Sequence, residues 1–185
     1  MSEKKGKRLS TRRVYNGRII KVDLDTVKLP NDATVELEVV RHPGAAAVVP
    51  FLTALDTYDP QLLLIRQYRH ATNDFIYEIP AGKLDGGEEP LECAKRELLE
   101  ETGCVAKAME HVYTFYTTPG FTDERIHAFM ATGLTRGDQN LQQDEVMTLE
   151  TVAMSRAMEM IRTGDIVDAK TALSILFVAG FRLGR

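Results

Sequence analysis

The sequence has little that would suggest a secreted or membrane-inserted protein. Its 185 residues include only two cysteines, Cys93 and Cys104, too few for a disulfide-stapled scaffold. No apolar run approaches the roughly 20 residues that span a bilayer. The basic N-terminus is not followed by the apolar segment of a secretory signal. We therefore expect a cytoplasmic protein with no membrane partner.

Two common catalytic patterns are also missing. The sequence has no phosphate-binding loop of the Gly-x4-Gly-Lys-Ser/Thr type. It also offers no convincing Ser-His-Asp or Cys-His arrangement for nucleophilic catalysis. A function in phosphate chemistry would therefore need a different kind of site.

The composition is that of an ordinary globular chain, with 44% hydrophobic and 27% charged residues. Residues 1–13 carry six Lys or Arg and one acid, a balance of +5, so a net charge of −4 leaves −9 for the rest. We interpret residues 1–13 as a disordered basic arm. Because an acidic body binds nucleic acid poorly, we expect no nucleic-acid partner.

Hydrophobic periodicity predicts a mixed α/β chain. Apolar and polar residues alternate from Arg18 to Leu29 and again from Val35 to Val39, which predicts a β-hairpin within residues 14–42. A separate α/β domain is expected over residues 43–185. Its expected strands cover residues 45–52, 62–65, 75–79, 109–117, 125–134 and 146–152, and its expected helices cover 90–102, 155–163 and 168–179.

The first expected helix has clear signals at both ends. Pro90 suits its first turn, and Gly103 suits its C-terminal cap. Leu91, Ala94 and Leu98 fall on one side of this helix, so we expect that stripe to pack against the core.

Three glutamates share an adjacent face of the same helix. Glu97, Glu100 and Glu101 lie at positions i, i+3 and i+4, where like charges destabilise an isolated helix. They also lie near the helix C-terminus, which is the unfavourable end for anions. A bound cation would offset both effects, and oxygen-only ligands favour a hard ion, Mg²⁺ or Mn²⁺. The alternative interpretation is a solvated acidic face.

The segment around these glutamates resembles the Nudix box, Gly-x5-Glu-x7-Arg-Glu-aliphatic-x-Glu-Glu-x-Gly-aliphatic. The fixed positions of this 23-residue pattern fall here on Gly82, Glu88, Arg96, Glu97, Leu98, Glu100, Glu101 and Gly103. The one departure is Cys104, where the pattern has an aliphatic residue, and cysteine packs as a small hydrophobe.

The resemblance implies a fold and a metal site. The implied fold is a Nudix-type α/β/α sandwich with a mixed β-sheet over residues 43–185, preceded by the N-terminal β-hairpin subdomain. Glu97 and Glu101 would bind the metal, with Glu100 close by and the carbonyl of Ala81 often added. Glu88 would be largely structural.

Two segments outside the box resemble the ADP-ribose pyrophosphatase branch of the family. In residues 118–124, amides beside a Pro-Gly turn at Gly120 and Phe121 can hold a diphosphate, and Glu124 can accept hydrogen bonds from ribose hydroxyls. The alternative is an ordinary type II turn. In the Arg-Gln-Tyr-Arg segment, Arg69 is expected to clamp the diphosphate, and its alternative role is a salt bridge at a sheet edge.

The same resemblance implies a homodimer. In that branch the N-terminal strands help to form a dimer and contribute to the partner's site, so residues 14–42 would be a dimerisation subdomain. A lone hairpin with an apolar side is also marginal in water, which favours a partner. Arg41, near the end of the hairpin, would approach phosphate across the dimer interface.

These features together predict Mg²⁺-dependent hydrolysis of the pyrophosphate bond of nucleoside diphosphate sugars. The expected substrate is ADP-ribose, which would yield AMP and ribose 5-phosphate after attack by a metal-activated water. Alternatives are another Nudix substrate, such as GDP-mannose, a dinucleoside polyphosphate or a capped RNA end. A Nudix-fold ligand sensor without turnover is a further alternative.

The general base is the part of the expected site that the sequence leaves open. Resembling enzymes often place a glutamate on the loop before the last strand, and here Gln143 stands at that position, with Glu145 at a metal-side position. A neutral amide cannot take a proton at working pH. Three accounts stay open: Glu145 or Asp144 is the base, a box residue such as Glu100 serves instead, or Gln143 is an engineered replacement for glutamate.

Overall fold

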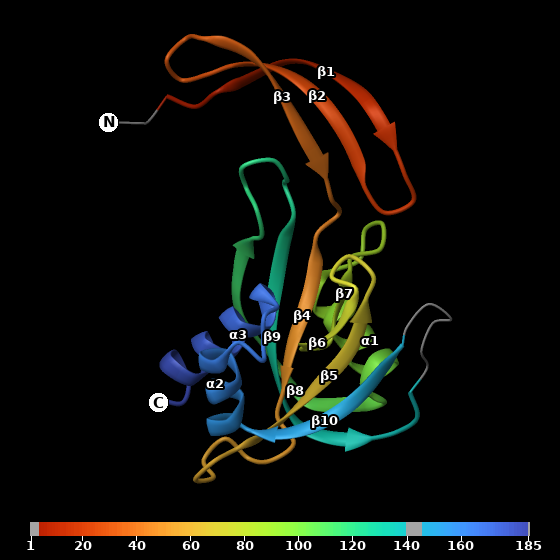
Figure 1. Cartoon of the computed structure of the whole chain (residues 1–185), viewed down its shortest axis with the longest axis vertical. Helices are drawn as coiled ribbons and strands as arrows, with labels where there is room; N and C mark the ends of the chain where they lie inside the picture. The colour runs from red at the N-terminus through yellow and green to blue at the C-terminus, as the bar shows by residue number, and fades with distance from the viewer. Residues whose placement is uncertain (1–3, 140–145, 185) are drawn as a thin grey trace. The chain divides into compact units, whose positions relative to one another are not determined.

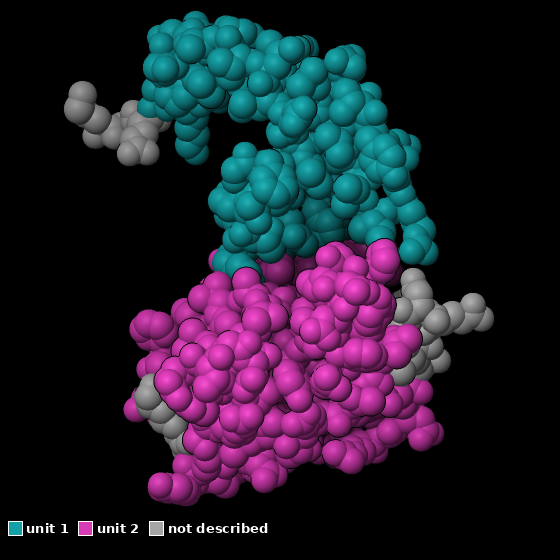
Figure 2. All heavy atoms as spheres, viewed as in Figure 1, with its two compact units in different colours: residues 1–44, 115–125 teal, residues 45–114, 126–185 magenta. Residues whose placement is uncertain are grey.

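The computed structural model describes residues 4–139 and 146–184, and it divides into two compact units. Unit 1 comprises residues 1–44 and 115–125, and unit 2 comprises residues 45–114 and 126–185 (Figure 2). No helix in these described ranges is long and apolar enough to cross a membrane.

Unit 1 is built on a three-stranded antiparallel sheet in the order β1-β2-β3 (Figure 1). The strands are β1 (Lys7–Asn16), β2 (Lys21–Lys28) and β3 (Thr34–Arg41). The expected hairpin is therefore present as β2 and β3, with Asp32 at the turn in a left-handed conformation of φ 67°.

The expectation of a disordered arm over residues 1–13 is wrong for residues 7–13, which form most of β1. Two side chains of this segment explain the difference. Arg13 forms an ion pair with Asp23, and the hydroxyl of Thr11 donates a hydrogen bond to Asp25. Both aspartates lie on β2 and are buried. Burying a carboxylate is costly unless it is paired, so β1 supplies partners that β2 requires.

Unit 2 contains two sheets and three helices. One sheet has the order β10-β5-β6 and the other the order β7-β4-β9-β8. The strands are β4 (Ala45–Pro50), β5 (Gln61–Arg69), β6 (Asp74–Glu78), β7 (Ala81–Lys83), β8 (Cys104–Tyr116), β9 (Arg125–Arg136) and β10 (Met147–Ala153). The helices are α1 (Pro90–Thr102), α2 (Met154–Thr163) and α3 (Ala169–Phe181). The three helices and most strands match the expected elements to within two residues, but β5 and β8 are longer than expected and β7 was not expected.

The second sheet of unit 2 is mixed, as expected, because β4 pairs in parallel with β9 and antiparallel with β7. In Figure 1, α1 lies on one side of the sheets and α2 and α3 on the other. Ala94 and Leu98 of α1 pack into a buried cluster with Ala46 and Val48 of β4. Continuous apolar strands such as β4 are typical of sheets covered on both faces.

The two ends of α1 have the predicted chemistry. Pro90 stands in the first turn, and Gly103 caps the C-terminus with φ 68° while its N–H donates to the carbonyl of Leu99. Gly103 is also closely packed, because a Cβ at this position would overlap the backbone of residues 137–139. The stripe facing the core differs in one position: Leu91 is 36% exposed, and Cys93 is buried instead.

Candidate functional site

Two buried glutamates of α1 lie against the backbone of β7. Glu97 is 6% exposed and Glu101 is 4% exposed, both low values for carboxylates. Oε2 of Glu101 accepts a hydrogen bond of 3.0 Å from the amide of Ala81. The carboxylate of Glu97 occupies the space that a Cβ on Gly82 would need. One turn of α1 thus places two carboxylates against the backbone of two consecutive residues, Ala81 and Gly82.

Arg96 forms ion pairs with three acids of the box. Its Nε and Nη2 each lie 3.0 Å from the Glu88 carboxylate, and its Nη1 lies 2.6 Å from Glu97 and 3.3 Å from Glu100. The hydrogen bonds from Arg96 lower the pKa of Glu88 to about 2, against the opposing effect of burial. Nη2 also donates to the carbonyl of Lys83 at 3.3 Å. Arg96 and Glu88 therefore fasten the loop before α1 to the helix.

The acid side chains are not arranged as a ready-made metal cage. Within residues 4–139 and 146–184, no three His, Cys, Asp or Glu side chains come together in a group that could hold a metal ion. Glu97 and Glu101, with the carbonyl of Ala81 nearby, nevertheless supply only oxygen donors of the kind that Mg²⁺ and Mn²⁺ prefer. Buried carboxylates against a side-chain-free Gly82 fit such an ion.

Cysteine chemistry is not part of this site. Cys93 lies on the buried side of α1, with its Sγ 3.5 Å from the carbonyl oxygens of Gly82 and Lys83. Burial raises the pKa of the Cys93 thiol to about 12. The group therefore stays protonated at neutral pH and packs as a small hydrophobe rather than acting as a nucleophile.

Arg69 forms the salt bridge that was the alternative to its expected role. Its Nε and Nη2 donate to Oε1 and Oε2 of Glu78 at 2.6 and 2.9 Å, and Glu78 lies on β6, at the edge of its sheet. The Arg69 side chain is still 42% exposed. Its predicted contact with a diphosphate stays a prediction, and the exposed part of the side chain leaves room for it.

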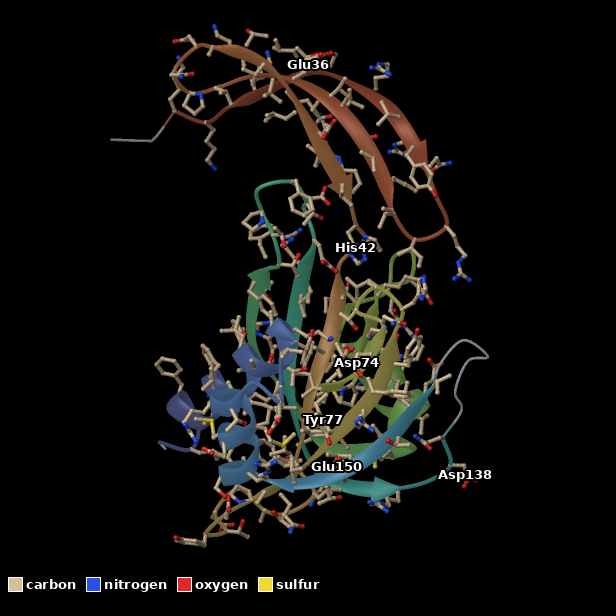
Figure 3. All side chains as sticks on the ribbon, viewed as in Figure 1. Glu36, His42, Asp74, Tyr77, Asp138 and Glu150 are labelled. Atoms are coloured by element: carbon tan, nitrogen blue, oxygen red, sulfur yellow. The ribbon has the colours of Figure 1, made fainter. Side chains whose placement is uncertain are left out.

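Arg66, the first arginine of the same segment, lies on the opposite face of β5. Its guanidinium is 5.3 Å from the centre of the Phe75 ring and 6.0 Å from that of Tyr77. The Tyr77 hydroxyl donates to Glu150 at 2.9 Å (Figure 3). Arg66 and Arg69 thus serve different surfaces, because side chains three positions apart on a strand point to opposite faces.

In unit 1, Arg41 is engaged by three carboxylates. Its guanidinium bonds to Asp23 at 3.1 Å, to Asp123 at 3.2 Å and, more closely, to Asp25. The side chain is 24% exposed. Arg41 therefore links the N-terminal sheet to the Pro-Gly segment, and its predicted contact with phosphate would need a nitrogen that already has an acidic partner.

The Pro-Gly segment is attached to β3 by backbone hydrogen bonds. The amide of Val40 donates to the carbonyl of Phe121 at 2.8 Å, and the Phe121 side chain is 54% exposed. Gly120 has open space where a Cβ would stand and lacks the positive φ that a type II turn requires. The segment nevertheless forms a turn, because the amide of Phe121 donates to the carbonyl of Thr118 at 3.2 Å, so only the expected turn type is wrong.

Glu124 lies at the end of the same segment. Its Oε2 accepts a hydrogen bond of 2.9 Å from the Thr117 hydroxyl, and its Oε1 is 3.3 Å from Nδ1 of His42, which Figure 3 labels at the end of β3. Unit 1 thus brings Arg41, Phe121 and Glu124 into one region. Two other predicted residues, Gln143 and Glu145, lie outside the described residues.

Sequence reasoning missed the partners of Glu78. Lys170, at the start of α3, forms an ion pair with Glu78 and a second one of 3.0 Å with Asp168. Asp168 also caps α3, since its carboxylate accepts a hydrogen bond from the amide of Thr171. The one available signal was Glu78 itself, an acid at the end of an otherwise apolar run that a buried strand cannot leave unpaired.

The chain is similar to known proteins in sequence and in fold. The NUDIX domain family matches residues 42–171. The chain is 38% identical over 174 residues to a methanol dehydrogenase activator from Bacillus methanolicus, covering 93% of this chain and 91% of that protein. It is 36% identical, with the same coverage, to an ADP-ribose pyrophosphatase from Bacillus subtilis (strain 168). A crystal structure of an ADP compounds hydrolase shares the fold with a TM-score of 0.82 at 21% identity, covering 100% of this chain and 97% of the other.

Proposed function

The chain belongs to the Nudix family, and on that premise we propose that it hydrolyses the pyrophosphate bond of nucleoside diphosphate sugars in a Mg²⁺-dependent reaction. ADP-ribose is the proposed substrate, and AMP and ribose 5-phosphate are the products. A curated relative that covers most of the chain carries the name ADP-ribose pyrophosphatase, which supports this choice.

The observation that carries the proposal is the placement of Glu97 and Glu101. Both carboxylates are buried against the backbone of residues 81–82. Burying two like charges one helical turn apart costs folding free energy, and a bound cation would offset that cost. We assign Glu97, Glu101 and the carbonyl of Ala81 to the divalent cation, with Glu100 at its edge. Mn²⁺ fits the same oxygen donors.

The divalent ion would supply charge neutralisation on the diphosphate and a lower pKa for a bound water. The chain's own residues prepare the rest of the reaction. Arg96 fixes Glu97 and Glu100 by ion pairs, so that their carboxylates do not rotate freely. Arg69 offers Nη1, the guanidinium nitrogen that does not bond to Glu78, to the phosphate oxygens. A water oxygen then attacks one phosphorus, the bridging P–O bond breaks, and a carboxylate accepts the water proton.

We assign the nucleoside and ribose to the Pro-Gly segment of unit 1. Phe121 offers an exposed ring, and the amide of Gly120 and the carboxylate of Glu124 offer polar contacts, whereas the amide of Phe121 already donates to the carbonyl of Thr118. Arg41 is assigned to phosphate in a homodimer formed through residues 14–42. Unit 1 supports such a dimer, because Tyr15 of the sheet, Ile19 of the β1–β2 turn and other large apolar side chains are exposed.

Product analysis on a panel of nucleotides tests the proposal. The panel contains ADP-ribose, GDP-mannose, a dinucleoside tetraphosphate and a capped RNA, each with Mg²⁺ and with EDTA. We expect AMP and ribose 5-phosphate from ADP-ribose, at a higher kcat/KM than for any other substrate and only with the metal. A higher kcat/KM for another member of the panel would show that this member, and not ADP-ribose, is the substrate. Binding without turnover of any member would favour a ligand sensor.

A second candidate function is the activation of an alcohol dehydrogenase. It follows from the relative named as a methanol dehydrogenase activator, which is 38% identical to this chain. Hydride transfer by dehydrogenases commonly uses nicotinamide cofactors, in which a diphosphate also links adenosine to a second ribose. NAD⁺ therefore belongs on the substrate panel, and an alcohol dehydrogenase assay with and without the protein belongs beside it. Activation of the dehydrogenase together with low ADP-ribose turnover would favour this candidate.

A further inference from the structure

Glu78 is a buried carboxylate shared by two cations. It is 2% exposed at the end of β6, and Arg69 contacts both of its oxygens, at 2.6 and 2.9 Å. Lys170 of α3 forms a second ion pair with Oε2. Burial opposes ionisation of Glu78, but the bonds from Arg69 and Lys170 outweigh that effect and lower its pKa. Glu78 is therefore a fixed anion between two positively charged side chains.

The start of α3 holds Lys170 firmly in this position. Asp168 accepts hydrogen bonds from the amide and the hydroxyl of Thr171, at 3.0 and 2.6 Å. The same hydroxyl accepts a hydrogen bond of 2.9 Å from the amide of Ile79, the residue after Glu78. The first turn of α3 is thus bonded directly to the backbone that leads into the Nudix box. The Lys170 side chain is only 15% exposed.

The bonds to Glu78 also fix which edge of Arg69 is left over. Nε and Nη2 form the edge that faces Glu78. Within the described part of the chain, Nη1 makes no hydrogen bond, and the side chain is 42% exposed. Because the guanidinium group is planar, fixing one edge directs Nη1 away from Glu78. Nη1 is therefore the donor available to a phosphate oxygen.

Lys170 decides how much of the Arg69 charge remains effective. With Glu78 as its sole partner, Arg69 would have its positive charge largely cancelled by a buried carboxylate at close range. Lys170 takes part of that negative charge, and Asp168, which balances Lys170, is itself stabilised at the positive end of α3. The net result is a guanidinium that two further charged side chains hold in place, with Nη1 directed away from Glu78.

We propose that Lys170 is a positioning residue for the substrate: by sharing Glu78 with Arg69, it orients Arg69 so that Nη1 binds the diphosphate. This inference rests on the proposed function for its substrate class, a diphosphate. It assigns to α3, distant in sequence from the box, a role in substrate affinity. Lys170 itself does not touch the substrate, so its loss acts on binding and on KM more than on kcat.

The test is a double-mutant cycle with a binding readout. Inorganic pyrophosphate is titrated calorimetrically, in EDTA, into wild type, Lys170→Met, Arg69→Gln and the double variant. We expect Lys170→Met to weaken binding about tenfold, the size of one lost charge-assisted hydrogen bond. In the Arg69→Gln background the same change should have less than about a twofold effect, since coupled residues are not additive.

Kinetics and control variants complete the test. With ADP-ribose, Lys170→Met should raise KM by about tenfold and leave kcat within about threefold. Lys170→Arg keeps the positive charge and should have the binding and KM of wild type. Lys107→Met, at an exposed lysine of β8, should change neither quantity. Should Lys170→Met fail to fold, Lys170→Gln replaces it in the cycle.

Two results would overturn the inference. One is a folded Lys170→Met variant with wild-type pyrophosphate affinity and KM. The other is an equal loss of affinity in the presence and absence of the Arg69 side chain, which would show that Lys170 does not act through Arg69. Because pyrophosphate binding needs no turnover, the cycle stays informative if wild type hydrolyses no nucleoside diphosphate sugar, a result that would count against the proposed function alone.

Discussion

The carboxylate of Glu97 fills the space beside Gly82 that any side chain at position 82 would occupy. This relationship explains why the first fixed position of the box is a glycine although its φ is not in the left-handed region. The requirement is steric: only a residue without a Cβ lets a buried carboxylate from α1 reach the backbone of β7.

Gly82→Ala should therefore impair metal-dependent activity without unfolding the protein. The added methyl group overlaps Glu97 and displaces its carboxylate, so the Mg²⁺ concentration for half-maximal activity should rise by about tenfold or more. Gly86→Ala is the matched control, because a Cβ there meets nothing within 4 Å. A Gly82→Ala variant with the Mg²⁺ dependence of wild type would contradict the assigned role of Glu97.

Glu97→Gln and Glu101→Gln should each lower turnover by orders of magnitude while the fold survives. The amide keeps the size of the side chain, and in Glu101→Gln its oxygen could still accept from the Ala81 amide, but the negative charge for a cation is lost. Circular dichroism checks the fold, and kcat at saturating Mg²⁺ checks the chemistry. Glu92→Gln, which removes an exposed partner of Lys95, is the control. Wild-type turnover in either box variant would refute the metal assignment.

The box helix was predictable because its determinants are local. Pro90 and Gly103 act through their own backbone conformations, and the glutamate spacing follows from the helical period. The exposure of Leu91 was not predictable in the same way, because the stripe that faces the core depends on how far α1 is rotated against β4. Cys93 occupies the buried side in its place.

Long-range ion pairs account for most of what the sequence did not reveal. The segment before residue 14 has the composition of a disordered arm, yet Arg13 and Thr11 satisfy two aspartates buried on β2. Lys170 and Glu78 are 92 residues apart, so no periodicity or motif connects them. Such pairs are set by which strands and helices meet, which a single sequence does not encode in any local pattern.

The pair of Glu88 and Arg96 predicts a pH dependence of stability. Arg96 lowers the pKa of Glu88 from its ordinary 4.5 to about 2 in the folded protein. A lowered folded-state pKa gives stabilisation that is complete above about pH 4.5 and is lost as the pH falls from about 4.5 to about 2. Glu88→Gln should therefore cost about 1 kcal/mol of unfolding free energy at neutral pH, a modest value for a partly exposed pair.

Urea unfolding of wild type and Glu88→Gln across this pH range measures the difference. We expect the two free energies of unfolding to converge as the pH approaches the folded-state pKa, because protonated Glu88 no longer pairs with Arg96. A difference that stays constant from neutral to acid pH would show that Glu88 stabilises the loop by something other than its charge.

The exposed apolar side chains of unit 1 predict a dimer that a single substitution should disrupt. Its sheet and the β1–β2 turn expose several large apolar side chains, namely Val14, Tyr15, Ile19, Ile20 and Leu37. Sedimentation velocity at micromolar concentration should show a homodimer for wild type and a monomer for Ile19→Asp, because a buried unpaired charge is costly at an interface. Tyr58→Asp, at a side chain of unit 2 that is 98% exposed, should stay dimeric. A wild-type monomer would refute the dimer.

The last prediction concerns the general base, which the sequence places on a loop outside the described residues. Replacing Gln143 by glutamate restores a group that can accept the proton of the attacking water. If Gln143 occupies the position of the base, kcat for ADP-ribose should rise by about 10²-fold or more in Gln143→Glu, the low end for general-base catalysis. KM should change little, since a glutamine and a glutamate fill nearly the same space. An unchanged kcat would return the role to Glu145, Asp144 or Glu100, and the collapse of turnover in Glu145→Gln would then identify Glu145.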